Sequence, residues 1–200
     1  MIKKILILTF VLALVPLGVS ASTHLSQSRD HLTPQEEELV KDAQILDVRI
    51  DVFIKAAERR LLVLKGVDPA NAKQLKKDAQ TWGELPTGTR PQLIGDISNI
   101  LDEAITNIDD VSSRDERNPL IAKALRKLAA EASHIVDQVK PLQREAKGEA
   151  EIGSFDQLME NAESILQAAN KLPPPPTKKD LKKEKAKSDK SKETSRSDSP

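Results

Sequence analysis

Residues 33–66 read TPQEEELVKDAQILDVRIDVFIKAAERRLLVLKG, and this stretch decides the fold class. Thr33, Pro34 and Glu36 supply a helix N-cap, a proline at the first helical position and the acid of a capping box. Gly66 supplies a C-terminal stop. Between them, apolar residues recur every three or four positions, as on one face of a helix: Leu39, Ala43, Leu46, Ile50, Phe53, Ala57, Leu61 and Leu64. The stretch therefore predicts a single long amphipathic helix.

A second apolar arc lies on the opposite side of this predicted helix. Its members are Ile45, Val48, Val52, Ala56 and Val63. A helix that is apolar on two sides either lies at the centre of a bundle or contacts a second molecule. Charged residues line the seams between the arcs, with Asp47 and Asp51 on one seam and Arg49 and Arg60 on the other. We expect these four residues to be partly buried and ion-paired rather than catalytic.

Similar signals for the start and end of a helix recur further along the chain. Asp68-Pro69 opens a short helix that ends near Gly83. Pro91 begins a longer helix that ends near Val111. Each of these helices carries an apolar stripe at helical spacing, which indicates that one face of it packs against a core.

Two more helices complete the predicted body. Asn118-Pro119 opens the first of them, and Pro141 should kink or end it near Val139. Ser154, with a glutamine three residues later, forms a capping box for the last helix. Four main amphipathic helices and one short helix, without a strand signal, predict an all-α fold, an antiparallel helical bundle.

The first 21 residues have the three parts of a bacterial-type signal peptide. Lys3 and Lys4 form the positive region, Ile5–Val15 is the apolar run, and Ser20 and Ala21 are the small residues of a cleavage site. We therefore predict export to the periplasm or the extracellular medium, with cleavage near Ala21. Retention of this segment as a membrane anchor is the alternative, and no later segment is apolar enough to span a bilayer.

Three segments follow in the predicted mature chain: a flexible leader at 22–31, a helical bundle domain at 32–172 and a Pro/Lys-rich disordered tail at 173–200. Residues 22–171 carry 20 basic against 26 acidic residues, a net charge of −6, whereas residues 172–200 carry 9 against 5, a net charge of +4. The tail lacks aromatic residues, which argues against nucleic-acid binding. The tail either solubilises the protein or attracts an anionic envelope surface or acidic partner through its lysines: Lys178, Lys179, Lys182, Lys183, Lys185 and Lys187.

The chain offers few groups for cofactor chemistry. It has no cysteine, which excludes disulfides, thiolate metal sites and covalent haem attachment. His24 and His31 fall in the predicted leader, so His134 stands alone in the body. Glu131 and His134 make half of a di-iron motif that needs a second copy. His134 and Met159 have the ligand types of exported b-type haem bundles, but one Trp, three Phe and no Tyr could hardly line a porphyrin. We predict no metal and no cofactor.

Catalytic arrangements also lack their parts. Ser133 and His134 are adjacent on one helix and point in different directions, so they do not form a nucleophile and base. Acidic pairs such as Asp109 with Asp110 are explained by charged helix faces. Neither a phosphate-binding glycine loop nor a nucleophile elbow occurs. We therefore predict a protein that is not an enzyme.

The segment Leu32-Thr33-Pro34-Gln35-Glu36 resembles the LTxxQ motif that opens helices in a family of small periplasmic helical chaperones and stress regulators. Glu36 stands where that family has glutamine, and the resemblance covers these five residues. It implies a holdase or client-binding role as one candidate function.

Together these features predict an exported, non-enzymatic helical protein. We expect it to act through protein–protein interaction or as an envelope component, and to bind a protein partner or a second copy through the second apolar arc. The alternative function is that of a periplasmic chaperone-like bundle, or of one that binds a small molecule or haem.

Overall fold

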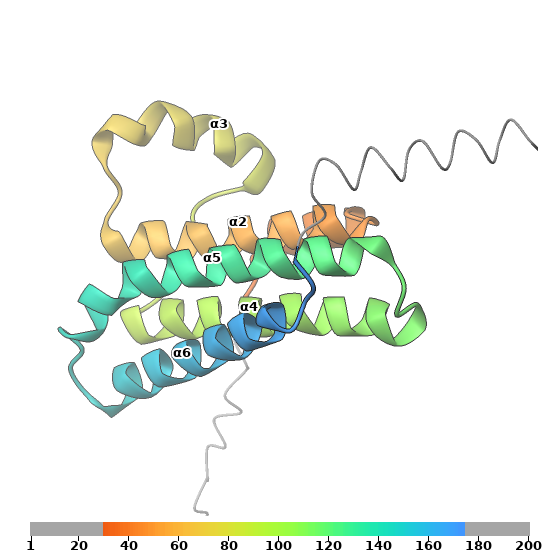
Figure 1. Ribbon diagram of the computed structural model, residues 1–200. Coiled ribbons are helices and arrows are strands. Elements are labelled where there is room, and N and C mark those ends of the chain that lie inside the picture. The colour runs from red at the N-terminus through yellow and green to blue at the C-terminus, as the bar shows by residue number, and fades with distance from the viewer. Residues whose placement is uncertain (1–29, 175–200) are drawn as a thin grey trace, which may run out of the picture.

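The computed structural model describes residues 30–174, and every regular element in that range is a helix (Figure 1). The predicted all-α fold is thus confirmed for these residues. The helices are α1 (Pro34–Asp42), α2 (Leu46–Lys65), the short 3-10 helix η1 (Pro69–Asn71), α3 (Ala72–Trp82), α4 (Arg90–Arg114), α5 (Pro119–Gln143) and α6 (Glu149–Asn170). The predicted signal peptide, residues 22–29 of the leader and residues 175–200 of the tail lie outside the described range.

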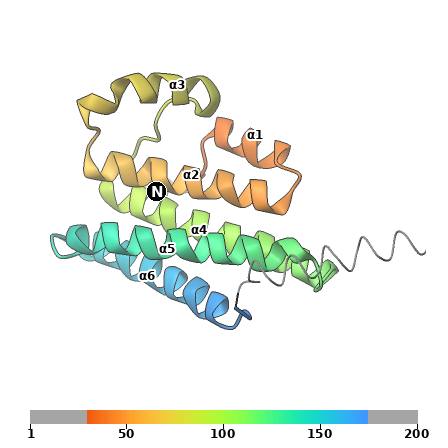
Figure 2. The same cartoon turned by 45° about the horizontal axis from the view of Figure 1, so that its top comes forward.

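Four long helices, α2, α4, α5 and α6, form the bundle (Figures 1 and 2). Near their starts, α2 and α5 are joined by the ion pair of Asp47 with Lys127. Near their ends, Lys65 of α2 donates a hydrogen bond to Gln138 of α5. The first contact lies earlier than the second in both helices, so α2 and α5 are parallel neighbours.

The helices α4 and α6 are parallel neighbours for the same reason. Arg90 at the start of α4 pairs with Glu151 at the start of α6, and Asn161 of α6 donates to Ser98 further along α4. In contrast, α4 packs antiparallel on α2, and α6 packs antiparallel on α5. Each bundle helix therefore has a parallel and an antiparallel neighbour, and α4 and α5 also contact each other. Bundle helices that are consecutive in the sequence run antiparallel.

The helix α2 is buried on two sides because both α4 and α5 pack against it. Ile50 and Phe53, from the first predicted stripe, are fully buried. Val52 and Ala56, from the second arc, are buried as well. A central position in the bundle therefore accounts for the middle of the second arc.

The single long helix predicted for residues 33–66 is wrong, because the chain is divided into α1 and α2. α1 ends at Asp42, and α2 begins at Leu46 after an extended Ile45. The contact that requires this break joins Glu36 to Arg60 in the interior. A straight helix would hold these two residues about 36 Å apart. The chain instead folds back and lays α1 against α2 (Figure 2).

The predicted start of the last helix is wrong, and of the kink or end predicted near Val139 the end does not occur. α6 begins at Glu149 rather than at Ser154, because the carboxylate of Glu151 accepts a hydrogen bond from the Lys147 backbone and stabilises the earlier start. α5 continues past Pro141 to its end two residues later. That proline lies in the last turn of α5, so the one helical hydrogen bond that it cannot donate is lost close to the end of the helix.

Candidate functional site

The helix α3 forms an arm that stands away from the bundle over α2 (Figures 1 and 2). It is amphipathic, yet none of its residues is fully buried, and Leu75, Ala79 and Trp82 are only half-buried. Gly66 and Gly83 stand in its two connections with φ angles of 85° and 69°, which favour glycine. The sequence therefore builds an amphipathic helix between two glycine turns and leaves its apolar side incompletely covered.

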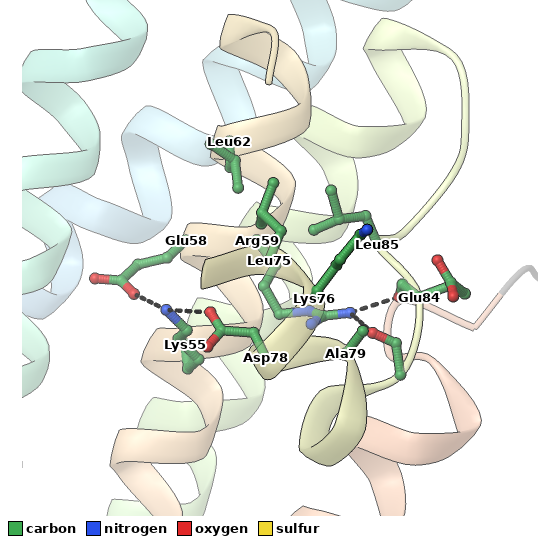
Figure 3. A pocket seen from close by; sticks show the side chains of 11 residues that line it. Lys55, Glu58, Arg59, Leu62, Leu75, Lys76, Asp78, Ala79, Glu84 and Leu85 are labelled. Atoms are coloured by element: carbon green, nitrogen blue, oxygen red, sulfur yellow. Dashed lines mark hydrogen bonds and ion pairs between the residues drawn. The ribbon is translucent and has the colours of Figure 1, made fainter. Parts of the chain in front are cut away.

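A hollow of about 540 Å³ lies between α3 and α2, and we name it the α3 groove (Figure 3). α2 forms one wall, α3 forms the other, and the loop that follows α3 closes one end. The lining residues are Lys55, Glu58, Arg59 and Leu62 of α2, Leu75, Lys76, Asp78 and Ala79 of α3, and Gly83, Glu84 and Leu85 of the loop. Apolar side chains from both helices thus face a shared space with charged side chains around it.

A second hollow of about 470 Å³ adjoins the α3 groove, because Glu58 and Leu62 line both. It lies beside the Gly66 turn, and His134 and Gln138 of α5 are among its lining residues. The accessible space therefore continues from the loop after α3 past Leu62 towards α5.

Charges of both signs surround the α3 groove (Figure 3). The Lys55 ammonium lies 3.5 Å from the Glu58 carboxylate and 3.9 Å from that of Asp78, so it bridges α2 and α3. Lys76 and Glu84 add one exposed charge of each sign. Exposed ion pairs contribute about 0–1 kcal/mol, so the Lys55 bridge holds α3 only weakly.

The C-terminal end of α3 is held more firmly, by Arg59. This side chain is only 4% exposed and donates from Nη2 to the carbonyls of Gly83 at 3.2 Å and Glu84 at 2.5 Å. Its guanidinium carbon also lies 5.9 Å from the centroid of the Trp82 ring, within reach of a cation–π interaction. Burial lowers the pKa of Arg59, while the charge of Glu36 opposes that shift.

Glu36 joins this anchor to the N-terminal end of the described chain. Its Oε1 accepts from Arg59 Nε at 3.0 Å and from Arg60 Nη1 at 2.7 Å, and its Oε2 accepts from the Thr33 backbone at 2.9 Å. Arg60 Nη2 donates in turn to the carbonyl of His31 at 2.7 Å. All three charged side chains are buried, and we name Glu36, Arg59 and Arg60 the Glu36 cluster. Glutamine, which the LTxxQ motif has at this position, would not bring the charge that faces the two arginines.

Three of the four seam residues lie in the first two turns of α2. Asp47 pairs with two lysines of α5, and the nearer of them, Lys123 at 2.6 Å, is the first cause of the lowered pKa of Asp47. Asp51 is exposed and pairs with Lys127 at 2.8 Å. Arg49 hydrogen-bonds to the Ala43 carbonyl and the Asn107 side chain. The fourth residue, the arginine at position 60, lies in the Glu36 cluster.

The five residues of the second apolar arc do not form one surface. Ile45 and Val48 are 57% and 46% exposed, and Val63 is half-buried. Val52 and Ala56 lie inside the bundle and cannot contact a partner. The predicted interaction face is therefore reduced to its N-terminal pair, with Val63 at the other end of α2.

The residues considered for cofactor chemistry lie in different surroundings. His134 is exposed, with Nδ1 3.2 Å from the Glu131 carboxylate, and Met159 packs against the hydrophobic core. Within residues 30–174, no group of three or more His, Asp or Glu side chains could hold a metal ion. His31, expected in a flexible leader, instead hydrogen-bonds through Nε2 to Glu103 at 2.7 Å. The tail lysines lie outside the described residues.

Sequence analysis identified Arg60 as a partly buried charge but missed its partner Glu36 and also Arg59, which shares that carboxylate. The sequence did contain a sign of the cluster, because Arg59 and Arg60 stand among the apolar residues of α2, and two buried arginines require acidic partners.

In the described part of the chain, no helix is both long enough and apolar enough to cross a membrane. Comparisons of the whole chain with protein-family models, curated proteins and solved structures give no match.

Proposed function

We propose that this chain is an exported, non-enzymatic binding protein that holds an amphipathic segment of a partner protein in the α3 groove. The observation that carries this proposal is the apolar side of α3, which faces an open hollow instead of a packed neighbour. An amphipathic helix gains stability by burying its apolar side, so a bound apolar segment would complete the packing of α3.

The lining of the groove favours a polypeptide over a small molecule. Leu62, Leu75 and Leu85 supply apolar contacts from three chain segments. The surrounding charges have both signs, as the polar side of an amphipathic helix also does. Docking an apolar helix side into such a groove is a recurrent mode of peptide recognition. A small-molecule ligand remains the second candidate, because hollows of 300–1,000 Å³ commonly take drug-sized ligands, and about 540 Å³ lies in that range.

Export and the absence of catalysis in this proposal rest on the sequence. The signal-peptide pattern of residues 1–21 supports export, and the missing catalytic motifs support a binding role. The lysines of the C-terminal tail, such as Lys178 and Lys182, would add attraction to an anionic envelope surface. Deleting residues 173–200 should then release the protein from isolated envelopes, whereas unchanged fractionation would favour a solubilising tail.

A peptide-binding experiment tests the groove itself. The probe is a fluorescein-labelled synthetic amphipathic helix made of leucine, glutamate and lysine, followed by anisotropy. Leu75→Glu puts a charge into the groove and should weaken binding at least about tenfold, because a buried leucine contributes about 1.5–3 kcal/mol. Ile152→Glu is the matched control, since Ile152 is an exposed apolar residue on α6 away from the groove.

Three outcomes would count against the proposal. The peptide could fail to bind the unaltered protein, or Ile152→Glu could weaken binding as much as Leu75→Glu does. The third is a Soret band on addition of haem that disappears in His134→Ala, which would favour the haem-binding alternative.

A further inference from the structure

We propose that the α3 groove is coupled to the N-terminal segment at residues 30–33 through the Glu36 cluster, so that loosening either one loosens the other. The coupling is a property of this chain alone, and its use to regulate partner binding rests on the function proposed above. The connection is a continuous series of polar contacts, buried at Glu36 and part-buried towards the N-terminal segment and towards the loop after α3.

The N-terminal side of this connection has three contacts. The carbonyl of His31 accepts from Arg60 Nη2, and the backbone N–H of Thr33 donates to Glu36 Oε2. The His31 ring hydrogen-bonds to Glu103 of α4 at 2.7 Å. Leu32, between His31 and Thr33 in the sequence, is buried in the core. The segment is thus held at a backbone carbonyl, at a backbone N–H and at one side chain.

The groove side of the connection depends on Arg59. This residue lines the α3 groove, and its Nη2 holds the carbonyls of Gly83 and Glu84, where α3 turns back towards the bundle. α1 adds a steric support at the same point, since a Cβ atom at Gly83 would lie 3.3 Å from Cβ of Gln35. The last turn of α3 therefore rests on α1 and on Arg59 together.

The two sides meet at one oxygen atom. Glu36 Oε1 accepts from Arg59 at 3.0 Å and from Arg60 at 2.7 Å, and both arginines are buried. Separating one of these side chains from the others would leave a buried charge without its partner, which is strongly unfavourable. The three side chains therefore move as a unit, and a displacement of α1 reaches the α3 groove through Arg59.

The direction of the coupling follows from these contacts. A bound segment that widens the groove pulls on the Gly83–Glu84 carbonyls and weakens the hold of Arg59. The Glu36 cluster then holds residues 30–33 less firmly, and the segment becomes easier to release. Coupling between two sites is reciprocal, so releasing the N-terminal segment should favour the widened groove by the same factor.

Trp82 makes this coupling measurable without any ligand. It is the single tryptophan, the chain has no tyrosine, and it lies against Arg59 at the end of α3. His31→Ala removes the bond to Glu103, which lies on α4, whereas Trp82 lies at the end of α3. We expect this variant to shift the Trp82 emission to the red and to raise its quenching by acrylamide. We also expect amide exchange at Gly83, whose N–H bonds to Ala79, to accelerate about tenfold, a loss of ~1.4 kcal/mol in local stability.

The controls separate coupling from general destabilisation. Glu38→Gln changes an exposed carboxylate of α1 and should leave Trp82 unchanged. Glu36→Gln breaks the shared link, so adding His31→Ala to it should move Trp82 little further. Far-UV circular dichroism must match in all variants at the temperature of the measurement.

Two results would overturn the coupling. One is a His31→Ala variant in which exchange at Thr33 accelerates while Trp82 and Gly83 stay unchanged. The other is full additivity of the two substitutions on Trp82. The Trp82 measurement contains no peptide, so it tests the coupling even if the peptide does not bind. Conversely, an unchanged Trp82 signal would overturn the coupling without contradicting peptide binding in the α3 groove.

Discussion

Glu36→Gln removes one negative charge from the interior and keeps nearly the same side-chain shape. The carboxylate is fully buried and accepts three hydrogen bonds, from Arg59 Nε, Arg60 Nη1 and the Thr33 backbone. Glutamine offers one acceptor oxygen in place of two, so its amide group would face either the Thr33 backbone N–H or the donors of both arginines. The substitution therefore leaves two buried arginines with a neutral partner.

The magnitude follows from the burial of these charges. Removing one partner of a buried ion pair costs about 3–5 kcal/mol, because the remaining charge is left without compensation. Asp96 lies 3.9 Å from Arg60 and offsets part of this loss. Glutamine can still act in the capping box with Thr33, so the start of α1 is preserved. We expect the free energy of unfolding to fall by about 3 kcal/mol, the lower end of that range.

Urea denaturation followed by far-UV circular dichroism measures this loss. Glu38→Gln is the matched control on the same helix, because Glu38 is exposed and pairs only with Lys41 at 2.8 Å. Its expected effect is below about 0.5 kcal/mol, as for other pairs at this helical spacing. A Glu36→Gln loss no greater than the Glu38→Gln loss would refute the buried-charge argument.

Two further predictions concern the N-terminal segment and the turns at α3. The hydrogen bond to Glu103 raises the pKa of His31 above its ordinary value of 6.5, so its stabilisation is complete below pH 6.5 and is lost as the pH rises through the raised pKa. His31→Ala should therefore lower the urea midpoint at mildly acidic pH and change it little at alkaline pH, and equal losses at both would contradict this linkage. Gly83→Ala should cost about 1–3 kcal/mol through its positive φ of 69°, and its Cβ would also press against α1. Gly66→Ala shares a positive φ but has open space around its Cβ, so thermal denaturation should show a smaller loss, and equal losses would exclude the steric contribution.

The starts of α1 and α5 could be predicted because their signals are local. Thr33 and Glu36 form the predicted capping box, and Asn118 caps α5 ahead of Pro119 as expected. Such caps depend on residues within one turn, so the sequence contains all of their determinants. The end of α2 at Gly66 is equally local.

The break between α1 and α2 could not be predicted in this way. Apolar residues keep their helical spacing through Ala43 and Leu46, and neither glycine nor proline marks the turn. The break depends on Glu36 reaching Arg60, a contact between residues 24 positions apart. Periodicity describes one helix face at a time and does not reveal which distant charge that face will meet.

The α3 groove was hidden for a related reason. The stripe of Leu75, Ala79 and Trp82 was visible in the sequence and indicated a side that packs against the core. The side chains are only half-buried, because the backbone of α3 packs closely on α1 and η1, whereas α3 meets α2 through side chains such as Lys55 with Asp78. A stripe shows that a helix has an apolar side, whereas the neighbour of that side is decided by the connections, here the glycine turns at Gly66 and Gly83.

The unequal attachment of α3 determines how a partner segment would enter the proposed site. At its C-terminal end, buried Arg59 holds two carbonyls and is itself held by Glu36. Elsewhere along the groove, the half-exposed ion pair of Lys55 with Asp78 at 3.9 Å joins α2 to α3 and is worth about 1 kcal/mol at most. α3 should therefore swing about its Arg59 end and open at the Gly66 turn. The adjoining hollow lies at that same turn, so a segment entering there would meet Leu62 before it reached Arg59 and would disturb the Glu36 cluster only when fully inserted.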